Sequence, residues 1–199
     1  MNSQLFTLDN RLDAATSLRL HDRLTAAAQA GGLLDVAYRM VDTPIGGLLL
    51  AATELGLVRV AFAAEGVDAV LAVLAEKVSP RILHSAGRLD PVARELDEYF
   101  AGGRTAFDLA LDFRLAGGFR RLVLGRLPDI GYGHTASYAV VAAAAGNPRA
   151  VRAVGTACAT NPLPIVLPCH RVVRSDGSLG GYLGGVAAKR ALLDLEAAG

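Results

Sequence analysis

The sequence contains few residues that could form disulfides or metal sites. Its only cysteines are Cys158 and Cys169, and four histidines are scattered over 199 residues. Two thiols can build neither a disulfide framework nor a four-ligand zinc site. We therefore expect two free thiols, as in a reducing compartment, and no structural metal.

Long apolar runs are also absent. No segment approaches the ~18 consecutive apolar residues of a membrane-spanning helix. Residues 1–5 lack the basic region that begins a signal peptide, and no apolar core follows them. These absences predict a cytoplasmic protein. The 52% of hydrophobic residues is typical of a globular chain, and the length allows one large domain or two small ones.

Charge is unevenly distributed, although the net charge is only +1. Residues 1–111 carry ten Lys/Arg and fourteen Asp/Glu, whereas residues 112–199 carry ten Lys/Arg and five Asp/Glu. The second part could therefore face a polyanion such as nucleic acid. An imbalance of this size also occurs as uneven surface charge without any function.

The segment 161–172 stands out because three prolines lie between positions 162 and 168, just before Cys169, His170 and Arg171. Proline fixes φ and restricts the residue before it, so the segment can hold the cysteine in one place. A thiol beside a base and a cation can be poised as a thiolate. The alternative is that Cys169 is simply a buried small apolar residue.

The first part of the chain predicts an appendage followed by a small α/β domain. In residues 1–35, Asp9 and Asn10 could cap a helix over 11–30 that Gly31 and Gly32 end. Residues 36–113 then alternate between patterns of strands and helices separated by turns. Strands are expected at 36–41, 47–52, 57–62, near Ile82 and at 107–113, and helices at 67–78 and 90–100. We expect a short antiparallel sheet, with His84 in a structural role.

Residues 114–199 predict a mostly helical second domain. Helices are expected at 118–127, 137–145, 148–159 and 186–197, with Asn147 capping the third, and a hairpin-like connection is expected around the turn 175–178. The overall class is therefore α+β. The pair 137–145 and 148–159 is joined by a tight turn, which is typical of a helix-turn-helix but also of an ordinary αα-hairpin.

The helix expected at 148–159 has almost only small side chains apart from Arg149 and Arg152. Such a face can approach another backbone closely, whether that of a second helix or the groove of a nucleic acid. In the second case, Arg152 projects from a smooth surface and could enter a base stack.

Several of these motifs together resemble the O6-alkylguanine-DNA alkyltransferases, also called methylated-DNA–protein-cysteine methyltransferases. The matching residues occur in the family's order over 118–199. They are Ser137-Tyr138, Gly146-Asn147-Pro148, Arg152-Ala153-Val154-Gly155, Asn161-Pro162, Pro164-Ile165, Pro168-Cys169-His170-Arg171-Val172-Val173, Gly180 to Gly185, Lys189, Leu192-Leu193 and Glu196. Before residue 112 the match rests on the strand pattern and on Thr43-Pro44-Ile45-Gly46.

The resemblance implies an active site. Cys169 would accept the alkyl group, His170 would act through a water as its base, Glu196 would orient His170, and Asn161 would brace the turn. The implied DNA-binding residues are Arg152, Tyr138, Ala153, Gly155 and Thr156, with Arg152 filling the gap left by a flipped base. The implied substrate pocket consists of Tyr138, Val172, Tyr182, Leu183 and Lys189. Leu183 and Gly125 depart from the family pattern, which usually has a small or polar residue and a tryptophan there.

The implied activity is DNA repair by irreversible transfer of an alkyl group from O6-alkylguanine in duplex DNA, with O4-alkylthymine as a second lesion on which such a protein could act. The target base must be flipped out at a cost of a few kcal/mol, and the thioether product allows one turnover. No cofactor, zinc or obligate protein partner is implied, and a monomer is expected. The alternatives are an alkyltransferase-like protein that binds lesions without repair, which would lack Cys169, and a cysteine hydrolase unrelated to DNA.

Overall fold

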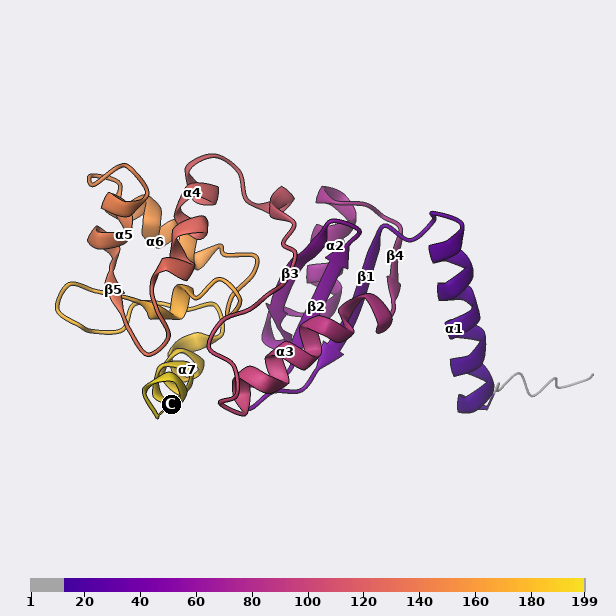
Figure 1. The fold of residues 1–199 in the computed structure, drawn as a ribbon. Coiled ribbons are helices and arrows are strands. Elements are labelled where there is room, and N and C mark those ends of the chain that lie inside the picture. The colour runs from indigo at the N-terminus through magenta and orange to yellow at the C-terminus, as the bar shows by residue number, and fades with distance from the viewer. Residues whose placement is uncertain (1–12, 199) are drawn as a thin grey trace, which may run out of the picture.

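A mixed four-stranded sheet forms the centre of the first half of the chain (Figure 1). The computed structural model describes residues 13–198. The strands are β1 (Val36–Val41), β2 (Leu48–Thr53), β3 (Gly56–Phe62) and β4 (Ile82–His84), in the order β3-β2-β1-β4. The antiparallel pairs β1·β2 and β2·β3 confirm the expected antiparallel sheet for these three strands. The fourth strand joins β1 in parallel, because helix α2 (Val67–Lys77) carries the chain across the sheet.

Helices cover both faces of this sheet. Every residue of β2 is buried, and alternate side chains of a strand point to opposite faces. Leu48 and Leu50 pack in the cluster that contains α3 (Asp90–Phe100), whereas Leu49 and Ala51 pack in the cluster that contains α2. The uninterrupted apolar run of β2 follows from this double coverage.

The N-terminal helix α1 (Ala14–Ala30) lies beyond β4, at the edge of the sheet (Figure 1). Its N-cap is Asp13, whose carboxylate accepts from the backbone N–H of Thr16 at 2.7 Å. The predicted caps Asp9 and Asn10 lie outside the described residues. The helix contacts β4 through His21, whose Nε2 lies 2.6 Å from the carbonyl oxygen of His84.

The prediction of a strand at 107–113 is wrong. This segment forms a single bridge, Leu57↔Leu111, beside β3. Its pairing is limited to the N–H of Leu57, which donates to Ala110 O, and the N–H of Asp112, which donates to Leu57 O. The chain then turns into the 3₁₀ helix η3 (Phe113–Leu115), because the Asp112 side chain caps it.

The second half is mostly helical, as expected. Its helices are α4 (Gly118–Arg126), α5 (Tyr138–Ala144), α6 (Val151–Ala159) and α7 (Gly185–Ala198). Short 3₁₀ helices occur in both halves. The first half contains η1 (Ala63–Glu65) and η2 (Gly87–Leu89), and the second contains η4 (Leu127–Asp129) and η5 (Cys169–Arg171). Helices α5 and α6 pack against each other across the connection 145–150, which fits both the helix-turn-helix and the αα-hairpin interpretation.

Two predicted details of this half differ in the structure. Helix α6 begins at Val151 because Asn147 caps the preceding turn instead, accepting from the N–H of Arg149 at 3.3 Å. The expected hairpin-like connection forms only at its turn, where Gly177 N donates to Arg174 O and Arg174 N donates to Ser178 O. Among the described residues, no strand ladder extends from it, because β6 (Val172–Val173) pairs in parallel with β5 (Ala136–Ser137), a segment distant in sequence.

The two halves share one hydrophobic core and a backbone hydrogen bond. The core cluster that contains Leu50 and Leu96 also contains Val123 and Leu167. The N–H of Val60, on the edge strand β3, donates to Pro162 O at 2.8 Å. The proline-rich segment is thereby attached directly to the sheet. No helix in the described part of the chain is long and apolar enough to span a membrane.

Gly56→Ala is expected to lower the free energy of unfolding by about 3 kcal/mol or more. Gly56 has φ +136°, and an added Cβ would overlap the backbone of Ala110. As a control, Gly102→Ala should cost only about 1 kcal/mol, because Gly102 has φ +75° in open space. Urea unfolding measures both, and equal costs would contradict the close approach at Gly56.

Candidate active site

Residues 161–168 form a buried segment that leads from α6 to Cys169. The Asn161 side chain ties its ends together. Its Nδ2 donates to Leu167 O at 2.9 Å and to Cys169 Sγ at 3.2 Å, and its Oδ1 accepts from Leu163 N at 3.0 Å. Asn161 therefore makes the expected hydrogen bonds to the backbone of this segment, and it also makes one to the sulfur of Cys169.

Backbone strain is concentrated in the same segment. Among the described residues, Ile165 is the only non-glycine with a positive φ, at 75°. A β-branched residue rarely adopts this conformation, which persists only where the surroundings enforce it. Ile165 is 1% exposed and lies between two residues that Asn161 bonds, Leu163 and Leu167.

The Cys169 thiol is buried and protonated at neutral pH. It is 2% exposed, and burial raises its pKa to about 11, against the opposing effects of the Asn161 hydrogen bond and the Lys189 charge. A thiol with this pKa is a weak nucleophile. Any reaction at Cys169 near pH 7 therefore requires a base that removes its proton.

His170 and Glu196 form a buried pair beside the cysteine. His170 Nε2 lies 2.8 Å from Glu196 Oε1, and both side chains are fully buried. Burial alone would raise the pKa of Glu196, but hydrogen bonds from His170, Arg171 and Tyr99 outweigh it and lower the pKa to about 2. The carboxylate is therefore ionised, which assigns the donor role to Nε2–H.

This assignment leaves His170 Nδ1 as the acceptor nitrogen. Nδ1 is buried and has no hydrogen-bond partner among the described residues. Burial lowers the pKa of His170 more than the Glu196 hydrogen bond and charge raise it, so the ring is neutral at pH 7. A neutral imidazole with a free Nδ1 lone pair is competent as a general base.

Sequence reasoning missed two other side chains that bind Glu196. Arg171 binds the carboxylate with two nitrogens, Nε to Oε2 and Nη2 to Oε1, both at 2.9 Å, and its Nη1 donates to Ile130 O at 2.6 Å. Tyr99 donates its hydroxyl to Oε1 at 2.7 Å. Arg171 belongs to the recognised motif, but nothing in the local pattern around Tyr99 indicates a contact with the last helix.

The predicted pocket residues gather around the glycine-rich segment 180–185. Lys189 is buried and donates from Nζ to Val172 O at 2.6 Å. An added Cβ at Gly180 would overlap the Tyr138 hydroxyl, so this glycine lets the tyrosine lie against the backbone. Tyr182 packs edge-on against His170, with ring centroids 6.3 Å apart.

Phe62, from β3, supports this pocket from the sheet, a contact that was not predicted. Its ring lies edge-on to Tyr182 at 5.7 Å, and an added Cβ at Gly184 would overlap it. Leu183 is half-buried against the core. The pocket wall therefore depends on a side chain from each half of the protein.

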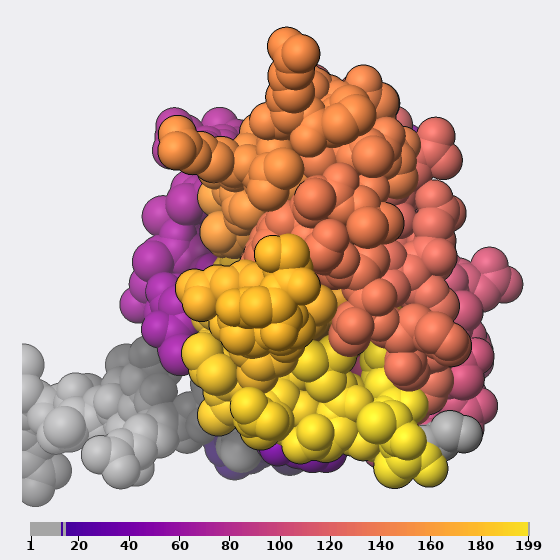
Figure 2. Space-filling model, turned by 90° about the vertical axis from the view of Figure 1, so that its left-hand side faces the viewer, coloured from indigo at the N-terminus to yellow at the C-terminus, as the bar shows by residue number. Residues whose placement is uncertain are grey.

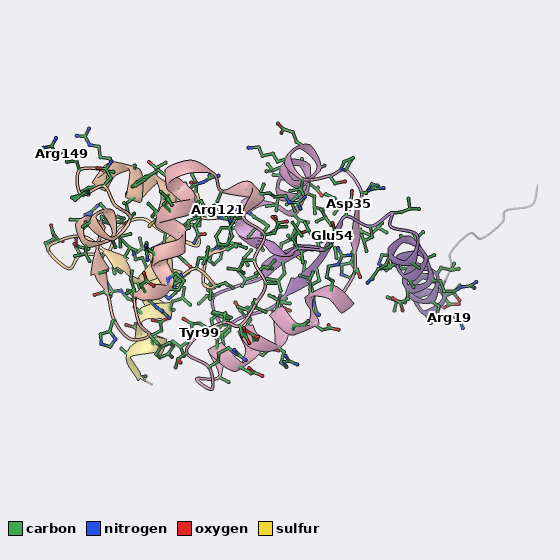
Figure 3. All side chains as sticks on the ribbon, turned by 45° about the horizontal axis from the view of Figure 1, so that its top comes forward. Arg19, Asp35, Glu54, Tyr99, Arg121 and Arg149 are labelled. Carbon is green, nitrogen blue, oxygen red and sulfur yellow. The ribbon has the colours of Figure 1, made fainter. Side chains whose placement is uncertain are left out.

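The predicted DNA-binding residues of α6 share an exposed surface. Arg152, Ala153 and Thr156 are exposed and Gly155 is half-buried, whereas Val154, Ala157 and Cys158 face the core. Figure 2 shows this side of the molecule. Long side chains of the orange part of the chain, which includes α6, project from the surface there. Arg149 lies at the tip of the same end (Figure 3).

Asn161→Ala is expected to raise the pKa of Cys169 further, because the Asn161 hydrogen bond lowers it. The free energy of unfolding should fall by about 2–4 kcal/mol, since Leu163 N and Leu167 O lose buried partners. Thiolate absorbance against pH, in a Cys158→Ser background, and urea unfolding measure the two effects. The exposed Asn147 provides the control variant Asn147→Ala, and an unchanged thiol pKa in Asn161→Ala would refute the contact.

Comparisons with known proteins match both halves of the chain. A model described as the DNA binding domain of 6-O-methylguanine DNA methyltransferase matches residues 118–198, and one described as its ribonuclease-like domain matches residues 36–113. The chain is 40% identical over 164 residues to the methylated-DNA–protein-cysteine methyltransferase of Mycobacterium tuberculosis, covering 81% of this chain and 92% of the relative. The constitutive enzyme of Bacillus subtilis is 38% identical, with 80% and 94% covered.

Solved structures agree. The crystal structure of the Mycobacterium tuberculosis O6-methylguanine methyltransferase has a TM-score of 0.71 at 38% identity, covering 82% of this chain and 93% of that one. The structure of Mycobacterium tuberculosis OGT in complex with DNA has a TM-score of 0.69 at 38% identity, covering 81% and 93%.

Proposed function

The chain belongs to the methylated-DNA–protein-cysteine methyltransferase family, which repairs DNA by alkyl transfer, and from this premise we propose that Cys169 is the alkyl acceptor. The observation that carries the proposal is the buried set Asn161–Cys169 and His170–Glu196, in which His170 Nδ1 alone is left to act as a base. Cys158 is the weaker candidate, because burial raises its pKa to about 12 and the Asn161 side chain donates to the Cys169 sulfur instead.

In the proposed reaction, the Cys169 proton passes through a water molecule to His170 Nδ1. The thiolate then attacks the alkyl carbon on O6 of guanine. An S–C bond forms while the C–O6 bond breaks, and its electron pair stays on guanine, which takes up a proton in exchange for the one that Cys169 lost. Glu196 stabilises the imidazolium, as the third member of a nucleophile–base–orienter set. The thioether is not hydrolysed, so each molecule reacts once.

The substrate base has to enter from the α6 side. The alkyl carbon on O6 is not accessible in stacked duplex DNA, so the nucleotide must be extruded. We propose that the Arg152 side chain fills the gap that the extruded base leaves in the duplex, because it is exposed on a helix face of small side chains. Tyr138, Val172, Tyr182, Leu183 and Lys189 are proposed to line the pocket that receives the base.

The protein is further proposed to act as a cytoplasmic monomer. All proposed catalytic groups come from one chain, and the two free thiols, Cys158 and Cys169, suit a reducing compartment. Residues 36–113 would support the site and residues 114–199 would carry it.

Incubation with duplex DNA that contains O6-methylguanine should add one methylene to the protein mass, on Cys169. Intact-protein and peptide mass spectrometry measure it, with a stoichiometry that does not exceed one. Cys158→Ser should still gain the mass, and Cys169→Ser should not. Binding to the damaged DNA without any change of mass would favour the lesion-binding alternative.

Arg152→Ala should slow reaction with O6-methylguanine in duplex DNA by about tenfold or more, since it removes a group that offsets part of the extrusion cost, and ~1.4 kcal/mol corresponds to a factor of ten. Reaction with free O6-benzylguanine needs no extrusion and should change less than twofold. Single-turnover kinetics on both substrates test this. Arg94→Ala, on α3 far from α6, should leave both rates unchanged. Equal losses on the two substrates in Arg152→Ala would show that Arg152 does not assist flipping.

A further inference from the structure

We propose that Tyr99 is a positioning residue for alkyl transfer, through which the sheet-containing half of the protein holds the carboxylate that orients His170. The inference rests on the proposed roles of Cys169, His170 and Glu196. It assigns to residues 36–113 a specific part in the chemistry, beyond supporting the fold.

Tyr99 reaches the site from far away in the sequence. It lies in the last turn of α3, where this helix meets the C-terminal half (Figure 3), and its side chain is fully buried. Its hydroxyl donates to Glu196 Oε1 at 2.7 Å across 97 positions of the sequence. The ring is fixed by Phe100 and Phe107, both with centroids 5.3 Å away, and by Tyr132 at 6.1 Å. The donor therefore has little freedom to move.

The oxygen that Tyr99 binds is the one that faces the base. Oε1 of Glu196 accepts from Tyr99, from His170 Nε2 and from Arg171 Nη2, whereas Oε2 accepts from Arg171 Nε and, at 3.3 Å, from Gly133 N. If Arg171 were the only donor, the carboxylate could still rotate about the line that joins it to the guanidinium group. The Tyr99 hydroxyl fixes the direction of Oε1 toward His170.

A purely space-filling role explains the ring but not the hydroxyl. A phenylalanine at position 99 would fill nearly the same space, as the ring of Phe100 does at the next position. Burying a hydroxyl costs free energy unless it finds a partner. Burial and the Glu196 hydrogen bond raise the pKa of Tyr99, so it remains a donor over the whole working range of pH.

The Tyr99 hydrogen bond also affects the basicity of His170. The groups that face Glu196 are Tyr99 from α3, Tyr132 and Gly133 from the loop after η4, and His170 and Arg171 from η5. Tyr182 and the charge of Lys189 act on the Glu196–His170 pair from the glycine-rich segment and from α7. Losing the Tyr99 donor concentrates more negative charge on Oε1, which stabilises the protonated imidazole. The pKa of His170 should then rise, and the acid limb of the pH–rate profile should move to higher pH.

Tyr99→Phe tests the proposal with Tyr132→Phe as its matched control. The Tyr132 hydroxyl donates to the backbone oxygen of Leu195 at 3.4 Å and not to Glu196, so its removal takes one hydrogen bond from α7 and leaves every donor of the carboxylate in place. Tyr99→Phe should slow single-turnover transfer from duplex O6-methylguanine and from free O6-benzylguanine by the same factor of about ten, the value of one hydrogen bond to a charged group. DNA affinity should not change.

The pH readout separates positioning from folding. In Tyr99→Phe, NMR titration of the His170 ring should show a pKa raised by about half a unit to one unit, with a matching shift of the acid limb. Tyr132→Phe should shift neither. 3-Fluorotyrosine at position 99 keeps the ring and strengthens the donor, so it should lower the pKa of His170 even if Tyr99→Phe folds poorly. Unshifted titrations with both substitutions, or equal rate losses in Tyr99→Phe and Tyr132→Phe, would overturn the inference.

The same experiments distinguish this inference from the proposed function. Wild-type protein that transfers no alkyl group, while its His170 titration still responds to position 99, would refute the function and keep the Tyr99–Glu196–His170 coupling. Wild-type protein that transfers normally, with no response to position 99, would refute only the coupling.

Discussion

The buried carboxylate of Glu196 is the interaction on which the site depends. An ionised carboxylate out of contact with water is very costly unless donors surround it. Its donors come from α3, from the loop at 133 and from η5, so three separate parts of the chain meet on one group of α7. The same carboxylate sets the tautomer of His170 and compensates the charge of Arg171. The proposed catalytic geometry and the tertiary packing are therefore satisfied by one set of hydrogen bonds.

A second constraint acts on the cysteine itself. The segment before Cys169 contains a strained residue, Ile165, and is held by Asn161 from within and by the edge strand β3 from outside, through Val60 and Pro162. An edge strand normally exposes unpaired backbone groups. Here β3 uses one of them, the N–H of Val60, to hold the segment 161–168 that leads to Cys169. The sheet therefore contributes at three points, with Val60 at the backbone, Phe62 at the pocket wall and Tyr99, on its covering helix, at the carboxylate.

Sequence patterns predicted the elements whose signals are local. The strand 36–41 and the helix 90–100 have the predicted bounds, because alternation and the Asp90-Pro91 start depend only on neighbouring residues. Predictions failed where pairing is distant. Residues 107–113 look like a strand, but their backbone bridges only to Leu57, and Val172 pairs with the distant strand β5. The start of α6 was misplaced because Asn147 can cap a turn as well as a helix.

The sequence alone determined the family and singled out Cys169 as the candidate acceptor, because the proline-rich segment and its Cys-His-Arg end form a specific local motif. Only the tertiary structure decided which atoms meet. It assigned Nε2 of His170 to Glu196, left Nδ1 as the candidate base, and brought Tyr99 and Phe62 to a site in the other half of the chain. These contacts join residues far apart in sequence. Their positions follow from the packing of α3 and β3 against the helical half. The spacing of apolar residues along the sequence predicts helices and strands, but it does not predict how they pack against each other.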